Sequence, residues 1–140
     1  MAERLILDTS VLVSAERGRL DLAAAAGDDA DAALPAIVVA EYLTGVHLAV
    51  TEEQGTARRE FLGRALQALP IETYTMRVAE RHSELLAHVR RSGTIRGAHD
   101  LIIAATALAT GRTVLTTDAR AGFDQLPGVT ARLVVLERSG

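Results

Sequence analysis

The sequence predicts an α/β fold with a mostly parallel central sheet. Short apolar runs, which suit strands covered on both faces, alternate along the chain with longer segments whose apolar residues recur at helical spacing. Two of these runs, residues 5–7 and 113–115, adjoin hydroxyl residues and an aspartate. Strands that alternate with helices are typical of a three-layer α/β/α domain. We therefore expect a single domain over residues 1–140 with about four to five strands.

Turn residues and apolar spacing divide the first half of the chain. The opening strand ends at Asp8, and Thr9 or Ser10 can cap the helix that follows. An extended segment is expected before Pro35, because the residue before a proline avoids the helical region. Polar residues 52–57 are expected to form a turn. The elements expected here are strands over 5–7 and 33–35 and helices over 11–15, 20–26, 37–46 and 58–69.

The second half repeats the alternation of strands and helices. Pro70 ends the preceding helix, and Gly93 is expected to end the longest one. Residues 98–109 are apolar on nearly all sides, which indicates a buried helix. A loop or short helix is expected over 119–126. The other elements expected here are strands over 71–74, 113–115 and 133–136 and a helix over 75–91.

Composition excludes several kinds of site. The chain has no cysteine, which rules out thiolate ligands and thiol nucleophiles. All 15 basic residues are arginine, so the lysine of a P-loop or a Schiff base is absent. A net charge of −3 gives no global attraction to nucleic acid. The apolar runs are shorter than the roughly 20 residues that a membrane span needs, and we expect a soluble cytoplasmic protein.

Four carboxylates are candidates for one shared site. Asp8 and Asp118 follow apolar strands, Asp100 begins the buried helix, and Glu41 lies within an otherwise apolar helix. In a parallel α/β sheet, strand ends and helix starts on one side face the same crevice, so these acids can converge. Taken singly, each could instead be a helix cap, a partner of the helix dipole, a turn residue or half of an ion pair.

Convergence of these acids would require a compensating cation. Two carboxylates about 5 Å apart repel by roughly 3 kcal/mol at an effective dielectric constant near 20. Oxygen ligands alone suit a hard ion, Mg²⁺ or its substitute Mn²⁺. Zinc is disfavoured because cysteine is absent and the four histidines show no paired ligand spacing. Asp124 is interpreted as a surface residue.

The chain resembles the PIN-domain nucleases, and more narrowly the VapC-type toxins of bacterial toxin–antitoxin modules. The resemblance spans nearly the whole chain and is carried by residues 7–10, 40–41, 99–105 and 115–118. It implies a PIN-like fold and metal-dependent hydrolysis of phosphodiester bonds in RNA, either transfer RNA or ribosomal RNA. Asp8 and Asp100 would hold the metal, Asp118 would complete the site, and Glu41 would orient or deprotonate a water.

Further residues and partners follow from the same interpretation. Arg96, just before the Asp100 helix, is the first candidate for guiding RNA, and Arg17, Arg19 and Arg120 also follow segments of the site. The hydroxyls of Thr9, Ser10 and Thr116 suit bonds to the acids or to a phosphate of the substrate. The resemblance also implies a small antitoxin protein as partner and a homodimer.

Two other functions stay open from the residues alone. An Asp-based phosphatase or a receiver domain also places an aspartate after its first strand. The phosphatase pattern needs an acid two residues later, where this chain has Ser10, and both classes need a lysine. A non-catalytic α/β binding module with structural acids is the second alternative.

Overall fold

The computed structural model describes residues 2–136 and contains one five-stranded parallel sheet. The strand order is β3-β2-β1-β4-β5, with β1 (Arg4–Leu7) at the centre. The other strands are β2 (Asp31–Pro35), β3 (Ile71–Glu72), β4 (Thr113–Thr116) and β5 (Ala131–Leu133). The helices are α1 (Thr9–Glu16), α2 (Leu22–Ala26), α3 (Ala36–His47), α4 (Glu52–Ala68), α5 (Met76–Ser92) and α6 (Ala98–Thr110), with 3₁₀ turns η1 (Ala119–Ala121) and η2 (Phe123–Gln125).

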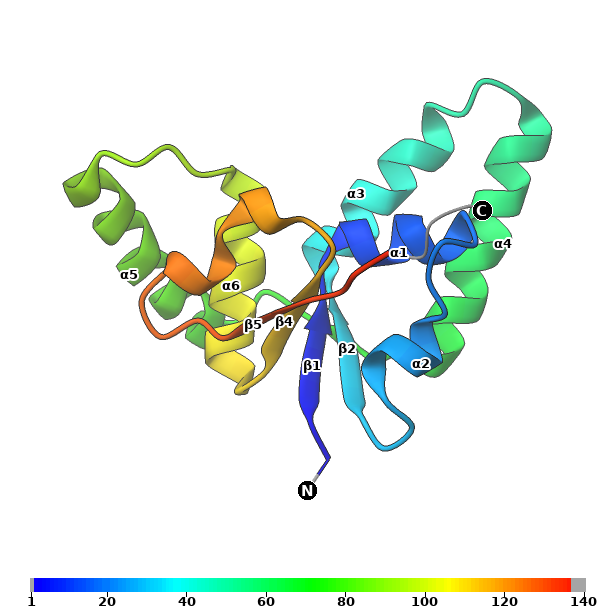
Figure 1. Ribbon diagram of the computed structural model, residues 1–140. Coiled ribbons are helices and arrows are strands. Elements are labelled where there is room, and N and C mark those ends of the chain that lie inside the picture. Colours follow the sequence, from blue (N-terminus) through cyan, green and yellow to red (C-terminus); the bar gives the residue numbers. More distant parts are fainter. Residues whose placement is uncertain (1, 137–140) are drawn as a thin grey trace.

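Helices cover both sides of this sheet, as Figure 1 shows. The pair α5 and α6 packs on one side, while α1, α2 and α4 lie on the other. Helix α3 follows β2 directly and contacts α1, α4 and α6 near the carboxyl ends of the strands. The prediction of a three-layer α/β/α fold with a parallel sheet is therefore confirmed.

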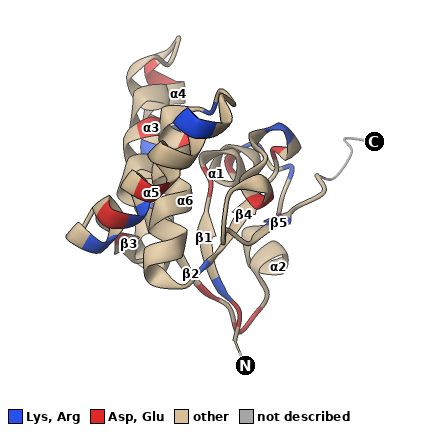
Figure 2. Cartoon of the chain, turned by 90° about the vertical axis from the view of Figure 1, so that its left-hand side faces the viewer, with Lys and Arg blue, Asp and Glu red and all other residues tan. Residues whose placement is uncertain are grey.

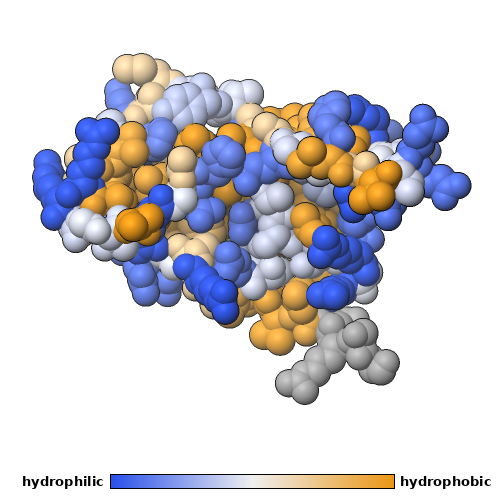
Figure 3. All heavy atoms as spheres, turned by 90° about the horizontal axis from the view of Figure 1, so that it is seen from above, coloured by the Kyte–Doolittle hydropathy of each residue, from blue (hydrophilic) through white to orange (hydrophobic). Residues whose placement is uncertain are grey.

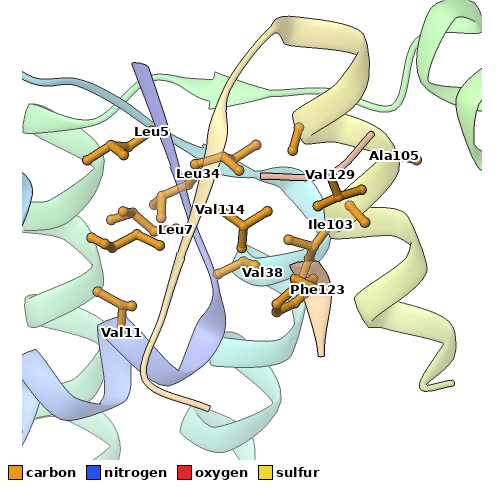
Figure 4. Packing of buried hydrophobic residues seen from close by; sticks show 14 of the residues in the cluster. Leu5, Leu7, Val11, Leu34, Val38, Ile103, Ala105, Val114, Phe123 and Val129 are labelled. Atoms are coloured by element: carbon orange, nitrogen blue, oxygen red, sulfur yellow. The ribbon is translucent and has the colours of Figure 1, made fainter. Parts of the chain in front are cut away.

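Aliphatic side chains fill the core between these layers (Figure 4). Leu5 and Leu7 of β1 are fully buried, as the uninterrupted apolar run predicted for a central strand. They pack in one cluster with Val114 of β4, Ile103 of α6 and Phe123 of η2. This packing fixes β1 and β4 as neighbours, so the polar residues after both strands are delivered to the same edge of the sheet.

Two expected elements are wrong. The last strand pairs over Ala131–Leu133 and not over residues 133–136, and Val135 is 86% exposed. As an edge strand β5 has only β4 beside it, so its apolar residues are not enclosed as in an interior strand.

The predicted turn at 52–57 is instead the first part of α4. The side chain of Thr51 accepts a hydrogen bond from the backbone N–H of Gln54 and caps the helix. Two glutamates in the first turn complement the helix dipole.

A buried arginine ties three strands together at the amino end of the sheet. Arg112 Nη1 donates to the carbonyl oxygen of Leu5 at 3.1 Å and to the carbonyl and carboxylate oxygens of Asp31 at 2.8 and 3.2 Å. Its Nη2 donates to Glu72 Oε1 at 3.2 Å. These partners belong to β1, β2 and β3, so one guanidinium links the central strand to the sheet edge.

None of the helices within residues 2–136 combines the length and the apolar character that a membrane crossing requires.

Candidate active site

Asp8 lies buried at the carboxyl end of β1, held by three hydrogen bonds. Its Oδ1 accepts from the backbone N–H of Thr9 at 2.8 Å. Its Oδ2 accepts from Ser10 Oγ at 2.9 Å and from Thr116 Oγ1 at 2.8 Å. Thr116 is the last residue of β4, so this contact joins the ends of the two central strands. The carboxylate is therefore fixed in one orientation.

The two hydroxyls that bond Asp8 also hold the segment after β4. Ser10 Oγ accepts from the backbone N–H of Thr117 at 3.1 Å, and Thr116 Oγ1 accepts from that of Asp118 at 3.0 Å. Each hydroxyl has a single hydrogen, which it donates to Asp8. Ser10 and Thr116 thus position the acid in this structure, and their contact with a substrate stays a prediction.

Glu41 reaches the same edge from α3. Its Oε1 accepts from Thr9 Oγ1 at 2.9 Å, and its Oε2 lies 3.3 Å from His99 Nδ1. Thr9 begins α1 and His99 lies in the first turn of α6, so Glu41 connects the two helices that flank the strand ends. The hydroxyl of Thr9, like those of Ser10 and Thr116, is engaged with an acid.

The electrostatics of Asp100 and Asp8 reflect their acidic neighbours. Burial, and then the charges of Asp8, Glu41 and Asp118, together raise the pKa of Asp100 to about 6, while His99 opposes them. Burial also raises the pKa of Asp8, against the lowering effect of its bonds from Thr116, Ser10 and Thr9. Figure 2 shows acidic positions at the upper end of β1. The four acids therefore lie within electrostatic reach of one another, and their action as one metal site stays a prediction.

The four acids lie near one another, but their side chains do not surround one common point. Asp118 is exposed, and its Oδ1 accepts from the backbone N–H of Arg120 at 2.9 Å, capping η1. Among residues 2–136, no three Asp, Glu or His side chains come close enough together to hold one ion as they stand. The all-oxygen donor set still fits Mg²⁺, which binds through one or two carboxylates and keeps several waters.

The side chain of Arg96 forms hydrogen bonds to the turns that follow β4. Its Nη1 donates to the carbonyl oxygens of Ala121 and Gly122 at 2.8 and 3.0 Å, and its Nη2 donates to Gln125 Oε1 at 3.1 Å. The side chain thereby fastens the loop before α6 to the turns after β4. A Cβ atom on Gly122, whose φ is +61°, would lie 2.6 Å from Arg96 Nη1. The predicted role of Arg96 in guiding RNA is a separate matter and stays a prediction.

Three hollows surround the acids at this edge, which Figure 3 views from above. The first, about 320 Å³, is lined by Glu41 and by residues 97–100. The second, about 140 Å³, lies beside Asp118 and Asp124, and Asp124 is exposed as expected. The third, about 130 Å³, lies between α1, α3 and α4. A larger apolar hollow of about 540 Å³, between α2 and α4, includes none of the four acids in its lining.

The fold and the site together define a class: parallel α/β proteins with interacting carboxylates at the carboxyl edge of the sheet. Residues 5–129 match the PIN domain family, and the chain belongs to that family. The resemblance expected from the sequence is confirmed. Membership of the PIN domain family argues against the alternatives of an Asp-based phosphatase and a receiver domain.

Curated and solved relatives agree with this assignment. The chain is 26% identical over 133 residues to "Ribonuclease VapC" of Rickettsia bellii, covering 95% of this chain and 98% of the relative. It is 40% identical over 78 residues to "Ribonuclease VapC2" of Mycobacterium tuberculosis, covering 54% of each chain. A VapBC2 structure from Rickettsia felis, bound to a promoter DNA fragment, superposes with a TM-score of 0.82 at 25% identity over 94% of this chain and 99% of that one.

Proposed function

We propose that this chain is the toxin component of a toxin–antitoxin module and acts as a Mg²⁺-dependent endoribonuclease. The observation that carries the proposal is the arrangement at the carboxyl edge of a PIN fold, where Asp8 is buried and bonded by Thr116. Burial and three other carboxylates raise the pKa of the neighbouring Asp100. Carboxylates gathered against their own repulsion need a cation to offset that cost. The names of the similar ribonucleases support RNA as the substrate, and we infer transfer RNA or ribosomal RNA in the cytoplasm.

Each acid has a distinct part in this proposal. Asp8 and Asp100 would hold Mg²⁺, or Mn²⁺ in its place, and Asp118 would complete the site or help to hold a second ion. The bound ion would lower the pKa of water and stabilise charge on the phosphoryl oxygens. Glu41, held on both oxygens by Thr9 and His99, would orient the attacking water or accept its proton.

A small antitoxin and a second copy of this chain are the proposed protein partners. Solved structures similar to this chain include VapBC complexes from Rickettsia felis and Salmonella typhimurium. The second of these is 21% identical and supports the fold alone. We infer that the antitoxin blocks the acidic edge, since a cationic side chain entering there would be paired much as the metal is.

RNA cleavage tests the proposal directly. Purified protein is incubated with total tRNA and with ribosomal RNA in Mg²⁺ or Mn²⁺, with and without EDTA, beside the Asp8→Asn variant. We expect discrete cleavage products with either metal, none with EDTA and none with the variant. Equal cutting by Asp8→Asn would reveal a contaminating nuclease. A binding module with structural acids would cut no RNA under any of these conditions.

Mg²⁺ is expected to stabilise the protein against heat at pH 7.5 and much less at pH 5. The folded-state pKa of Asp100, about 6, lies above the ordinary value of 3.8 for an aspartate. The folded protein thus holds its proton more tightly than the unfolded chain. Without metal, stability falls as pH rises from about 4 to 6 and then levels. Protons compete with the ion below pH 6, whereas at pH 7.5 an ion at 100 times its Kd contributes about 2.7 kcal/mol.

Thermal unfolding measured with and without Mg²⁺ at both pH values checks this prediction. Asp28→Asn removes an exposed acid before β2 and should keep the full effect of the metal. An equal Mg²⁺ effect at pH 5 and 7.5 would contradict the proposed competition between ion and proton.

Gly97→Ala is expected to weaken Mg²⁺ binding about tenfold. A Cβ atom on Gly97, the N-cap of α6, would lie 3.1 Å from Asp100 Oδ2, so the carboxylate must shift by a few tenths of an ångström. Gly63→Ala on α4 is the control, since its Cβ meets nothing within 4 Å. That variant should leave metal binding unchanged and stabilise the fold by about 0.5–1 kcal/mol. Titration calorimetry with Mg²⁺ compares the two, and equal affinities would refute the expectation.

A further inference from the structure

The hollow between α1, α3 and α4 opens directly beside the acidic site. Thr9 and Glu41, which bond each other there, form part of its lining. Arg17 and Arg58 contribute two positive charges to the lining, and Glu16 and Glu41 contribute two negative charges. Its volume is about 130 Å³, and one water occupies roughly 30 Å³ of liquid. The space therefore suits a phosphate group and is too small for a whole nucleotide.

Charge distinguishes this hollow from the other two at the edge of the sheet. The hollow on the far side is lined by Asp118 and Asp124 and has no cationic side chain in its described lining. The hollow at the start of α6 is lined by Glu41, His99 and Asp100. An RNA strand whose scissile phosphate sits at the acids must place its neighbouring phosphates to either side. The arginine side offers guanidinium donors to a phosphate, whereas the charged side chains on the Asp118 side are carboxylates, which repel one.

Arg58 is held in place before any ligand arrives. It lies on α4, and its Nη1 donates to the carbonyl oxygen of Gly45 on α3 at 2.8 Å. Within residues 2–136, Nη2 and Nε of this guanidinium make no hydrogen bond, and the side chain is only partly exposed. A guanidinium fixed through one nitrogen, with free donors beside a hollow, needs little ordering to bind a phosphate. Arg17 ends α1 at the rim of the same hollow and is exposed.

We propose that Arg58 and Arg17 form a subsite for the RNA phosphate adjacent to the scissile one. The subsite places this neighbouring phosphate on the arginine side of Asp8 and Asp100, and not on the side of Asp118. This inference rests on the proposed ribonuclease function. Arg58 and Arg17 contact the substrate away from the reacting atoms, so they determine binding and leave the chemical step to the acids.

The chain offers matched controls for both arginines. Arg58→Gln is compared with Arg59→Gln, since Arg59 is the next residue of α4 and lines a different hollow. Arg17→Gln is compared with Arg77→Gln, since Arg77 is an exposed arginine on α5 outside the lining of the hollow. Each pair has the same change in net charge. We expect Arg58→Gln and Arg17→Gln to raise KM for the cleaved RNA about tenfold, the size of one charge-assisted hydrogen bond, with kcat within twofold of wild type.

Two further variants guard against a folding artefact. Arg58→Lys keeps the charge and should recover most of the affinity even if Arg58→Gln lowers the melting temperature. Glu16→Gln removes one of the two negative charges in the lining of the hollow and should lower KM. The salt dependence of binding should also become shallower in Arg58→Gln and Arg17→Gln, and stay unchanged in Arg59→Gln and Arg77→Gln.

Filter binding of total tRNA, measured on ice in Mg²⁺, is carried out beside the kinetics. It tests the arginine subsite separately from the proposed ribonuclease function. If wild type cuts no RNA, the ribonuclease proposal fails, and the subsite is then judged by binding alone. Equal tRNA binding and equal KM within each matched pair would overturn the subsite. A fall in kcat with unchanged KM would also overturn it, because the arginines would then act on the chemical step.

Discussion

Replacing Asp100 with asparagine is expected to lower RNA cleavage at least about 100-fold while making the metal-free protein more stable. Second-sphere partners of a bound metal typically contribute 10- to 100-fold, so the loss of a direct ligand should cost at least as much. The variant removes a charge that burial, Asp8, Glu41 and Asp118 all oppose. Loss of function and gain of stability should therefore appear together in one substitution.

The size of the stability gain follows from the pKa of Asp100. A rise from 3.8 to about 6 corresponds to roughly 3 kcal/mol at 1.36 kcal/mol per pH unit. Because the side chain is partly exposed to solvent, we expect about 1–2 kcal/mol at pH 7.5 without metal. The gain should become small near pH 4, where the carboxyl is protonated in the folded state and partly protonated in the unfolded state.

Urea unfolding of both proteins in EDTA at pH 7.5 and pH 4 measures this gain, and the RNA assay measures the loss of cleavage. Asp28→Asn serves as the control in both, since it removes one exposed acid far along the chain from the site. An Asp100→Asn protein that is less stable than wild type at pH 7.5 would show that this carboxylate contributes favourably to the fold, contrary to the expected repulsion.

Replacing Arg112 with methionine is expected to destabilise the protein by about 3–5 kcal/mol. The substitution keeps much of the aliphatic volume but leaves Asp31 and Glu72 without their shared cation and the Leu5 carbonyl without its side-chain donor. Arg112 is 8% exposed, and removing one partner of a buried ion pair typically costs this much. Because the guanidinium links β1, β2 and β3, the loss weakens the sheet as a whole.

Arg4→Met provides a control that shares a partner with Arg112. Arg4 pairs with the same Asp31 at 3.9 Å, but half of its side chain is exposed, so its removal should cost about 1 kcal/mol or less. Urea unfolding at pH 7.5 compares both variants with wild type. The slope of the unfolding free energy against urea concentration is expected to be unchanged. Equal costs for the two substitutions would show that burial adds nothing to the Arg112 contacts.

Much of the fold was predictable because it depends on local patterns. The uninterrupted apolar run at β1 indicated a strand buried on both faces, and the apolar segment at α6 indicated a buried helix. Positions of the acids at strand ends and helix starts followed from these elements, which led to the expectation that they converge. The prediction of a strand over 133–136 was wrong, because an apolar run does not reveal whether a strand has one neighbouring strand or two.

Sequence alone determined most of the elements and led to the expectation that Asp8, Glu41 and Asp100 lie on one side of the sheet, since local periodicity and parallel topology indicate both. Only the tertiary structure decided that Thr116 bonds Asp8 across 108 positions of chain, that Arg112 bridges three strands and that Arg58 lies beside the acids. These contacts join segments remote in sequence. Their partners depend on how the layers pack, and no local pattern of residues encodes that packing.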